Sequence, residues 1–302
     1  MPRQLPGRLP PVVHRGDRSW TRAELSALTS ARTVRTAIAA GEVVAVLPGR
    51  YVSAPHQLAT VPRAHAAMTA TRGVLTGECA LFLRGVVDRP PRQILVAAAR
   101  GRRIEGTSWL RTFQPGTAPG STAIGELDIA WITEASLDAW SRGPMDRRVG
   151  AVLTALQRRA LTAHQLREGA GARQRIRDRA GLENVIAAFE SGVHSWLEHE
   201  AFTKVFTGAE FRRFVRQHAV IARGKRRYLD MFDPATMTSV ELDGSRYHLA
   251  GEQREADAER DADLATLGIS TLHFTYAQIT RRPEWCRETV RAALRARARF
   301  AS

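Results

Sequence analysis

Cysteine, lysine and long hydrophobic runs are all scarce in this chain of 302 residues. Cys79 and Cys286 are the only cysteines and lie far apart in the sequence, so they indicate neither a disulfide framework nor a zinc site. The longest apolar runs, VVAVL and ILVAAA, are far too short to span a bilayer, and the amino-terminal segment lacks the apolar core of a signal peptide. We therefore expect a cytoplasmic protein with no membrane segment.

Basic residues are abundant, and almost all of them are arginine. Lys204 and Lys225 are the only lysines among 45 basic residues, which stand against 30 acidic ones and give a formal net charge of +15. A chain this basic is expected to bind a polyanion, with double-stranded DNA as the first candidate. A GC-rich genome also favours arginine over lysine, so a generically basic protein stays open as the alternative.

Two short helices are predicted near the amino terminus. Residues 1–18 are rich in proline, arginine and glycine and are expected to form a loose arm. Thr21 followed by Glu24 matches a capping box and predicts a helix over residues 21–28. A second helix is expected over residues 31–40, because Thr29 and Ser30 interrupt the first and Gly41 ends the pattern.

A hairpin is expected directly after these helices. The run EVVAVLPGRYVSA has two β-rich halves around Pro48-Gly49. Helix, tight turn, helix and hairpin in about 35 residues describe a winged helix-turn-helix, whose second helix enters the major groove of DNA. We assign residues 1–58 to this arm and winged helix.

The run SARTVRTAIAAGEVVAVLPGRYV resembles the N-terminal domain of the AbiEi family, antitoxins of bacterial toxin-antitoxin systems. The resemblance implies that Arg32, Thr33 and Arg35 face DNA bases or phosphates, that Arg50 contacts a flanking phosphate, and that a cognate toxin is a further partner. The alternative is that Arg32 and Arg35 only solvate a small helix.

Residues 59–180 read as a mixed α/β connecting domain. Helices are expected over residues 62–71 and 76–85, strands over 94–99 and 109–113, and two further amphipathic helices follow. The segment resembles the connecting region of the same family and contains no catalytic constellation. His65 and His164 have no partners at metal-ligand spacing, so surface or helix-end positions are expected for both.

Residues 181–302 are expected to form a mixed sheet flanked by helices, in the order α-β-β-β-α-β-α. The overall fold class is therefore α/β (α+β). The first helix carries an apolar stripe of Leu197, Ala201 and Val205, with Glu198 at its rim.

Three acidic residues follow in neighbouring strands. Asp230 lies in one strand, and Glu241 and Asp243 alternate with Val240 and Leu242 in the next, so both acids face the same way. Carboxylates at this range repel one another unless a cation lies between them, and Mg²⁺ or Mn²⁺ is the natural candidate. The alternative is the polar face of an edge strand.

The segment LD…VELDGSRYH…RDADLATLGISTLHFTYAQI resembles the very-short-patch-repair-like endonucleases, a branch of the PD-(D/E)XK superfamily. The resemblance covers roughly residues 195–295 and implies a restriction-endonuclease-like fold. It also implies that a helix glutamate and two strand acids organise the metal site, that Asp243 belongs to the site, and that a histidine protonates a leaving group or orients water. The matching residues are Glu198, Asp230, Glu241 and His248, with Asp230 and Glu241 as the metal ligands.

These observations predict a DNA-binding, divalent-metal-dependent endonuclease used in phage defence, repair or restriction. Arg254 or Arg260 on the following helix could grip the scissile phosphate. His273 departs from the family, because the corresponding strand more often carries arginine. The chief alternative is an AbiEi-like transcriptional repressor or antitoxin with a catalytically inactive nuclease-like domain, and RNA or modified DNA stays open as substrate.

Overall fold

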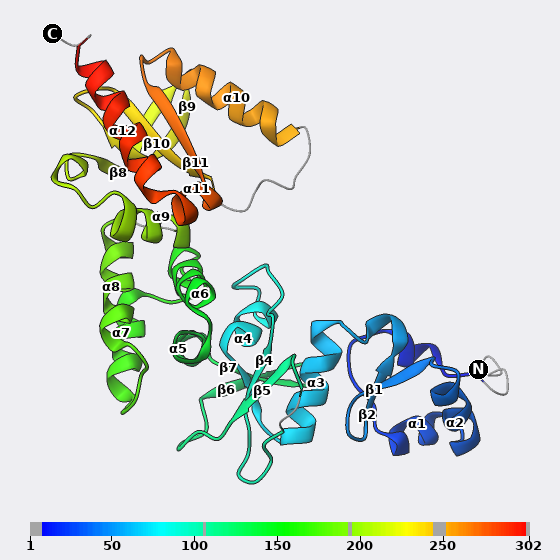
Figure 1. Cartoon of the computed structure of the whole chain (residues 1–302). Coiled ribbons are helices and arrows are strands. Elements are labelled where there is room, and N and C mark those ends of the chain that lie inside the picture. Colours follow the sequence, from blue (N-terminus) through cyan, green and yellow to red (C-terminus); the bar gives the residue numbers. More distant parts are fainter. Residues whose placement is uncertain (1–7, 105–106, 193–194, 244–251, 300–302) are drawn as a thin grey trace. The chain divides into compact units, whose positions relative to one another are not determined.

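The chain is mixed α/β and divides into two compact units, residues 1–179 and residues 180–302 (Figure 1). The computed structural model describes residues 8–104, 107–192, 195–243 and 252–299. Within these ranges it contains a two-stranded, a four-stranded and a five-stranded sheet, which confirms the predicted α+β class. No helix in the described ranges is long and apolar enough to cross a membrane. The three-domain division stays a prediction.

The first unit begins with two short helices and a hairpin. Helix α1 has the predicted capping box, because Thr21 and Glu24 each bind the backbone N–H of the other, and Ser30 caps α2. Gly41, just after the end of α2, has φ of +71°, a left-handed conformation that suits glycine. The elements are η1 (Pro11–His14), α1 (Arg22–Leu28), α2 (Ala31–Ala39), β1 (Val43–Leu47), β2 (Arg50–Ser53) and η2 (Ala54–His56).

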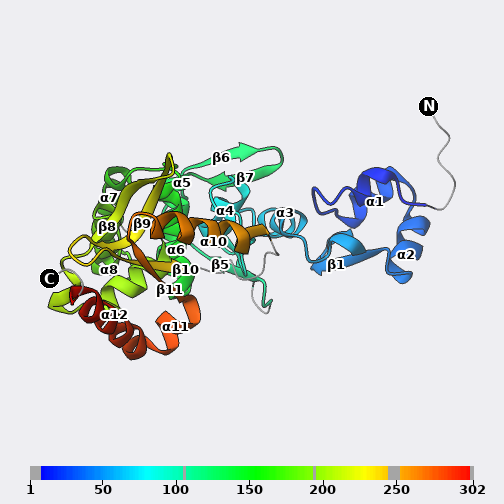
Figure 2. The ribbon, with the colours of Figure 1, turned by 90° about the horizontal axis from the view of Figure 1, so that it is seen from above.

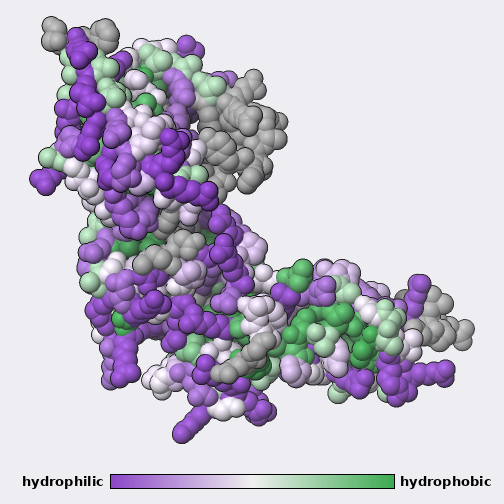
Figure 3. All heavy atoms as spheres, in the orientation of Figure 1, coloured by the Kyte–Doolittle hydropathy of each residue, from purple (hydrophilic) through white to green (hydrophobic). Residues whose placement is uncertain are grey.

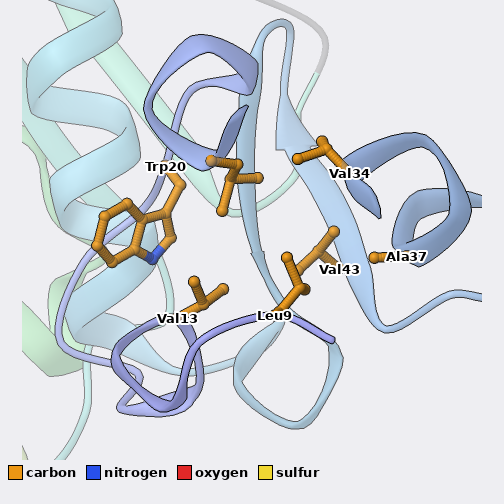
Figure 4. Close-up of a cluster of buried hydrophobic side chains, with 7 residues drawn as sticks. Leu9, Val13, Trp20, Val34, Ala37 and Val43 are labelled. Carbon is orange, nitrogen blue, oxygen red and sulfur yellow. The ribbon is translucent and has the colours of Figure 1, made fainter. Parts of the chain in front are cut away.

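The expected loose arm is wrong for the residues from Leu9 onward. Leu9 and Val13 are buried, and with Trp20 they pack against Val34 and Val43 in one hydrophobic cluster (Figure 4). Trp20 also exchanges two backbone hydrogen bonds with Tyr51 of β2, each 2.8 Å long. The small helix pair has too little apolar surface for a core of its own, so the preceding segment completes it.

Replacing Thr21 by alanine is expected to destabilise the first unit by about 1 kcal/mol, the usual cost of losing a helix N-cap. Thr21 Oγ1 accepts the N–H of Glu24 over 3.1 Å, and alanine leaves that donor without its partner. Urea unfolding measures the change, and Thr21→Ser, which keeps the hydroxyl, is the control. An alanine variant as stable as the serine variant would contradict this account.

The middle of the first unit is built on a five-stranded sheet in the order β5-β4-β3-β7-β6. Strands β3, β6 and β7 and helix α5 were not predicted. The three strands have only three or four residues each, too few to show a clear alternation. The strands are β3 (Val74–Thr76), β4 (Ile94–Ala97), β5 (Leu110–Phe113), β6 (Ser121–Ile124) and β7 (Leu127–Ala130). The helices are α3 (Thr60–Thr71), α4 (Gly77–Leu83), α5 (Ile132–Arg142), α6 (Met145–Gln157) and α7 (Ala163–Ala172).

His65 of α3 is buried, which corrects the expected surface position. Its Nδ1 lies 2.9 Å from Ser19 Oγ, and its Nε2 lies 3.2 Å from Glu126 Oε2. His65 therefore connects the amino-terminal segment with the β6–β7 turn. His164, by contrast, is exposed as predicted.

The second unit has a four-stranded mixed sheet in the order β11-β10-β9-β8, in which β10 and β11 are parallel and the other pairs antiparallel. Helices α10 and α12 lie on opposite sides of this sheet (Figure 2), and hydrophilic side chains cover the outer face of α12 (Figure 3). The strands are β8 (Val215–Ala222), β9 (Lys225–Asp233), β10 (Thr238–Asp243) and β11 (Ser270–Thr275). The helices are α8 (Arg179–Glu190), α9 (Trp196–Glu200), η3 (Ala201–Val205), η4 (Ala209–Phe211), α10 (Glu252–Ala265), α11 (Tyr276–Arg281) and α12 (Pro283–Ala298).

Candidate active site

Asp230 lies just beyond the end of the hydrogen-bonded pairing between β9 and β10. The antiparallel pairing of β9 with β10 ends at Met231 and Val240. Beyond this pair the backbone N–H of Leu242 donates to Asp230 Oδ2 over 2.9 Å, so a carboxylate oxygen accepts a main-chain hydrogen bond between the strands. This bond fixes the Asp230 carboxylate at the carboxyl-terminal half of β10.

Gln217 of β8 contacts Asp230 from the other neighbouring strand. Its φ is +47°, and the β8–β9 pairing skips it between Arg216 and His218. Its Nε2 donates to Asp230 Oδ1 over 3.2 Å and to Glu198 Oε2 over 3.4 Å. The Gln217 amide thus links two of the predicted site acids. Residues other than glycine in a left-handed backbone conformation are found more often at functional sites than elsewhere.

Glu198 enters the cluster from helix α9. Ser195 caps this helix by accepting the N–H of Glu198 over 3.0 Å. Leu197, Ala201 and Val205 are buried, which confirms the predicted apolar stripe. Glu198 itself is only 6% exposed, so its carboxylate is withdrawn from water beside the sheet.

Glu241 of β10 is the second buried strand acid. Its Oε1 accepts the Ser239 hydroxyl over 2.9 Å, and its Oε2 forms an ion pair with Arg260 of α10 at 2.8 Å. The same Arg260 nitrogen donates to the Tyr228 carbonyl over 2.6 Å. Arg260, predicted to grip a phosphate, therefore contacts a site carboxylate here.

Burial and like charge disfavour ionisation of both strand acids. Burial is the main cause that raises the pKa of Asp230, although the N–H of Leu242 and the charge of Arg260 oppose it. The pKa of Glu241 is raised to about 7. Burial is the main cause, and the neighbouring Asp230 charge adds to it more than Arg260 takes away. A pair of acids held this way is stabilised by any added cation.

Asp243 forms a separate contact next to this pair. His273 of β11 lies with Nδ1 3.3 Å from Asp243 Oδ2 and Nε2 3.0 Å from Asp261 Oδ1. The hydrogen bond to Asp243 and the nearby Asp261 raise the pKa of His273 to about 9, so the imidazole is cationic at neutral pH. This strand position therefore holds a positive charge at neutral pH.

The structure brings together Glu198, Asp230 and Glu241 and sets Asp243 beside His273. His248 lies outside the described residues, and the side chain of Arg254 does as well. Sequence reasoning missed Gln217, which no motif distinguishes.

The acid cluster fits a hard divalent ion in donor type and charge, since carboxylate oxygens are the ligands that Mg²⁺ and Mn²⁺ prefer. Across the described residues, no set of three or more His, Cys, Asp and Glu side chains is arranged to hold a metal ion. The carboxylate oxygens of Asp230 and Glu241 instead meet Gln217, Leu242, Ser239 and Arg260. An ion held by Asp230 and Glu241 would therefore replace some of these partners.

The predicted DNA-contacting residues lie on α2 and β2 of the first unit. Arg32 and Arg35 are exposed on α2. Thr33 is engaged locally, because its Oγ1 lies 2.9 Å from the Oγ of the helix cap Ser30. Arg50 is half-buried, near enough to lower the pKa of Glu24. Of the four residues, Arg32 and Arg35 are the best presented to a ligand.

The stability of the metal-free second unit is expected to fall as the pH rises from about 5 to about 9. The pKa of Glu241 is raised from 4.5 to about 7, so the folded state holds the proton more tightly and loses stability as that proton leaves. The pKa of His273 is raised from 6.5 to about 9, so its stabilising charge is fully present below pH 6.5 and is lost as the pH rises through 9. Both groups therefore act in the same direction.

Urea unfolding in EDTA at several pH values measures this slope. The Glu241 contribution between pH 5 and 7 is on the order of a few kcal/mol. The control is Glu241→Gln, which has no proton to release and should flatten the curve between pH 5 and 7 only. Equal slopes for the two proteins in that range would show that the Glu241 carboxyl titrates normally.

Two groups of residues are thus candidates for function. The second unit holds the acid cluster of Glu198, Asp230 and Glu241, and the first unit presents Arg32 and Arg35 on α2. Comparison with protein-family models and with curated protein sequences finds no match to this chain.

Proposed function

We propose that the protein is a DNA-binding, divalent-metal-dependent endonuclease that hydrolyses phosphodiester bonds in phage defence, repair or restriction. The observation that carries this proposal is the linked acid cluster. Asp230 and Glu241 are buried, ionise reluctantly and lie beside a third acid, Glu198, held through Gln217. Neighbouring buried acids with raised pKa values are typical of functional sites, and this favours a cation site over a purely structural role.

Asp230 and Glu241 would hold the metal ion. A bound divalent ion supplies Lewis acidity toward the scissile phosphate and a lowered pKa for bound water. Gln217 orients the carboxylates of Asp230 and Glu198 by donating to both. Arg260, which pairs with Glu241 here, is the cation available to a phosphate bound at that carboxylate. His248 is proposed as the proton carrier on the family resemblance alone.

DNA binding is proposed for the first unit. Helix α1, the turn at Thr29 and Ser30, helix α2 and the β1–β2 hairpin follow in the order of a winged helix-turn-helix. Arg32 and Arg35 on α2 would contact bases or phosphates, and Arg50 at the hairpin would contact a flanking phosphate. The net charge of +15 supports a polyanionic partner.

The second candidate is an AbiEi-like repressor or antitoxin with an inactive nuclease-like domain and a cognate toxin as partner. The Arg260–Glu241 ion pair favours it, because an internal cation already offsets one of the site charges. This ion pair would stabilise the folded second unit even when no metal is bound.

Incubation of the full chain with supercoiled plasmid tests the two candidates against each other. Nicking in Mg²⁺ or Mn²⁺ that EDTA abolishes supports the endonuclease. Tight duplex binding with no nicking in either metal would instead support the repressor. A parallel incubation with RNA and with modified DNA identifies the substrate class.

A further inference from the structure

A cavity of about 300 Å³ in the first unit is lined by an excess of arginine. It lies between the start of α4, the strands β4 and β5, and the junction of α5 with α6. Glu78 is the one acidic residue among the described residues that line it. The arginines are Arg92, Arg111, Arg142, Arg147 and Arg148.

Two of these arginines form short ion pairs, and Arg142 forms a longer one with Asp138. Arg147 forms an ion pair with Glu78 at 2.5 Å, and Arg148 forms one with Asp178 at 2.5 Å. Within the described residues, neither Arg92 nor Arg111 forms an ion pair, and both are exposed at the cavity. Among the described residues, the cavity lining therefore keeps a net positive charge after its ion pairs are counted.

Arg142 is held in an unusual way at the same cavity. Its guanidinium lies over the Phe113 ring, 3.4 Å from the ring centroid, and its backbone carbonyl accepts a hydrogen bond from Arg111. Its Nε is buried with no hydrogen-bond partner, and the nearest carboxylate oxygen, on Asp138, is 3.9 Å away. The Arg142 side chain is 34% exposed overall, so an anion in the cavity would contact the exposed part of its guanidinium rather than the buried Nε.

The rest of the lining combines apolar side chains with the polar Gln93 and Ser108. Leu95, Ala139 and Pro144 line the cavity beside the arginines. A bare phosphate would leave these walls in contact with water, whereas a ligand with an attached ring system would cover them. The volume is at the lower end of the range of about 300–1,000 Å³ that is usual for small-ligand sites.

We propose that this cavity binds a nucleoside phosphate, with the phosphate on Arg92, Arg111 and Arg142 and the nucleoside against Leu95, Ala139 and Pro144. Guanidinium forks match phosphate oxygens in geometry and charge, and the apolar walls add the contact that selects a nucleoside over the free anion. The site is independent of the acid cluster and of the proposed endonuclease activity. Its ligand is either a free mononucleotide or the 5′-phosphorylated end of an oligonucleotide.

Calorimetric titration of the full chain with AMP, inorganic phosphate and adenosine tests the proposal. AMP is expected to bind at least about tenfold more tightly than either fragment, because only AMP uses both the arginines and the apolar walls. Equal affinity for AMP and phosphate, or no AMP binding at millimolar concentration, would overturn it. A 5′-phosphorylated trinucleotide that competes with AMP more strongly than AMP itself would identify the oligonucleotide end as the source.

The double variant Arg92→Gln and Arg111→Gln removes two exposed charges from the cavity. It is expected to raise the dissociation constant for AMP about tenfold or more and to leave adenosine binding unchanged. The matched control is Arg175→Gln with Arg177→Gln, which removes two exposed arginines of the same unit outside the cavity. Equal weakening by the two double variants would show that AMP binds to the general positive charge and would overturn the site.

Discussion

Replacing Asp230 by asparagine is expected to lower the rate of Mg²⁺-dependent plasmid nicking on the order of 10³-fold. A catalytic metal supplies several kcal/mol of transition-state stabilisation, and each 1.36 kcal/mol corresponds to a factor of ten in rate. Asp230 carries one of the two charges that would hold the ion, and asparagine keeps the shape of the side chain without that charge. The measurement is the single-turnover nicking rate in saturating Mg²⁺.

The same variant is expected to be at least as stable as the wild type in EDTA. Asparagine ends the repulsion between Asp230 and Glu241, still accepts the Leu242 N–H, and can pair with a turned Gln217 amide. Lost activity with retained stability would separate a chemical role from a structural one. The charge-matched control is Glu288→Gln, an exposed position on α12 that should change neither quantity.

Two results would contradict the metal-dependent site. One is nicking by the asparagine variant at the wild-type rate. The other is a large loss of stability in EDTA, because that would make Asp230 a structural acid whose charge the fold needs. The second result would favour the repressor candidate, in which Arg260 offsets the charge of Glu241 permanently.

Local signals in the sequence were enough to predict several of the helices and strands correctly. The capping box at Thr21 and the alternation around Glu241 each depend on neighbours a few residues away, and each predicted element is present. The apolar stripe beside Glu198 was also predicted, and Leu197, Ala201 and Val205 are buried as expected. These signals work because helix caps and strand faces are set by short-range geometry.

The contacts that tune the site depend on long-range pairing, which the sequence does not display. His273 reaches Asp243 because β10 and β11 run parallel in a register that pairs His273 with Glu241, two residues before Asp243 on the same strand. Gln217 reaches Asp230 only because its backbone adopts φ of +47°, which no residue type signals for glutamine.

Replacing Arg32 and Arg35 together by glutamine is expected to weaken duplex binding roughly 10–100-fold near 0.1 M salt. Each phosphate contact contributes about 0.9 to the slope of log affinity against log salt concentration, so two lost contacts lower the slope by about 1.8. Both side chains are exposed on α2, so their loss leaves the buried cluster around Val34 and Ala37 unchanged. Fluorescence anisotropy with a labelled duplex at several salt concentrations measures affinity and slope together.

The salt slope decides whether α2 reads DNA or the whole chain binds it through its net charge. The double variant Arg175→Gln with Arg177→Gln loses the same charge from exposed positions elsewhere in the unit. If α2 lies against the phosphates, only the Arg32 and Arg35 variant lowers the slope, because counterions are released only where side chain and phosphate are in contact. If both double variants lower affinity equally, the charge of +15 acts without a defined interface, and the winged-helix proposal fails even where the endonuclease proposal stands.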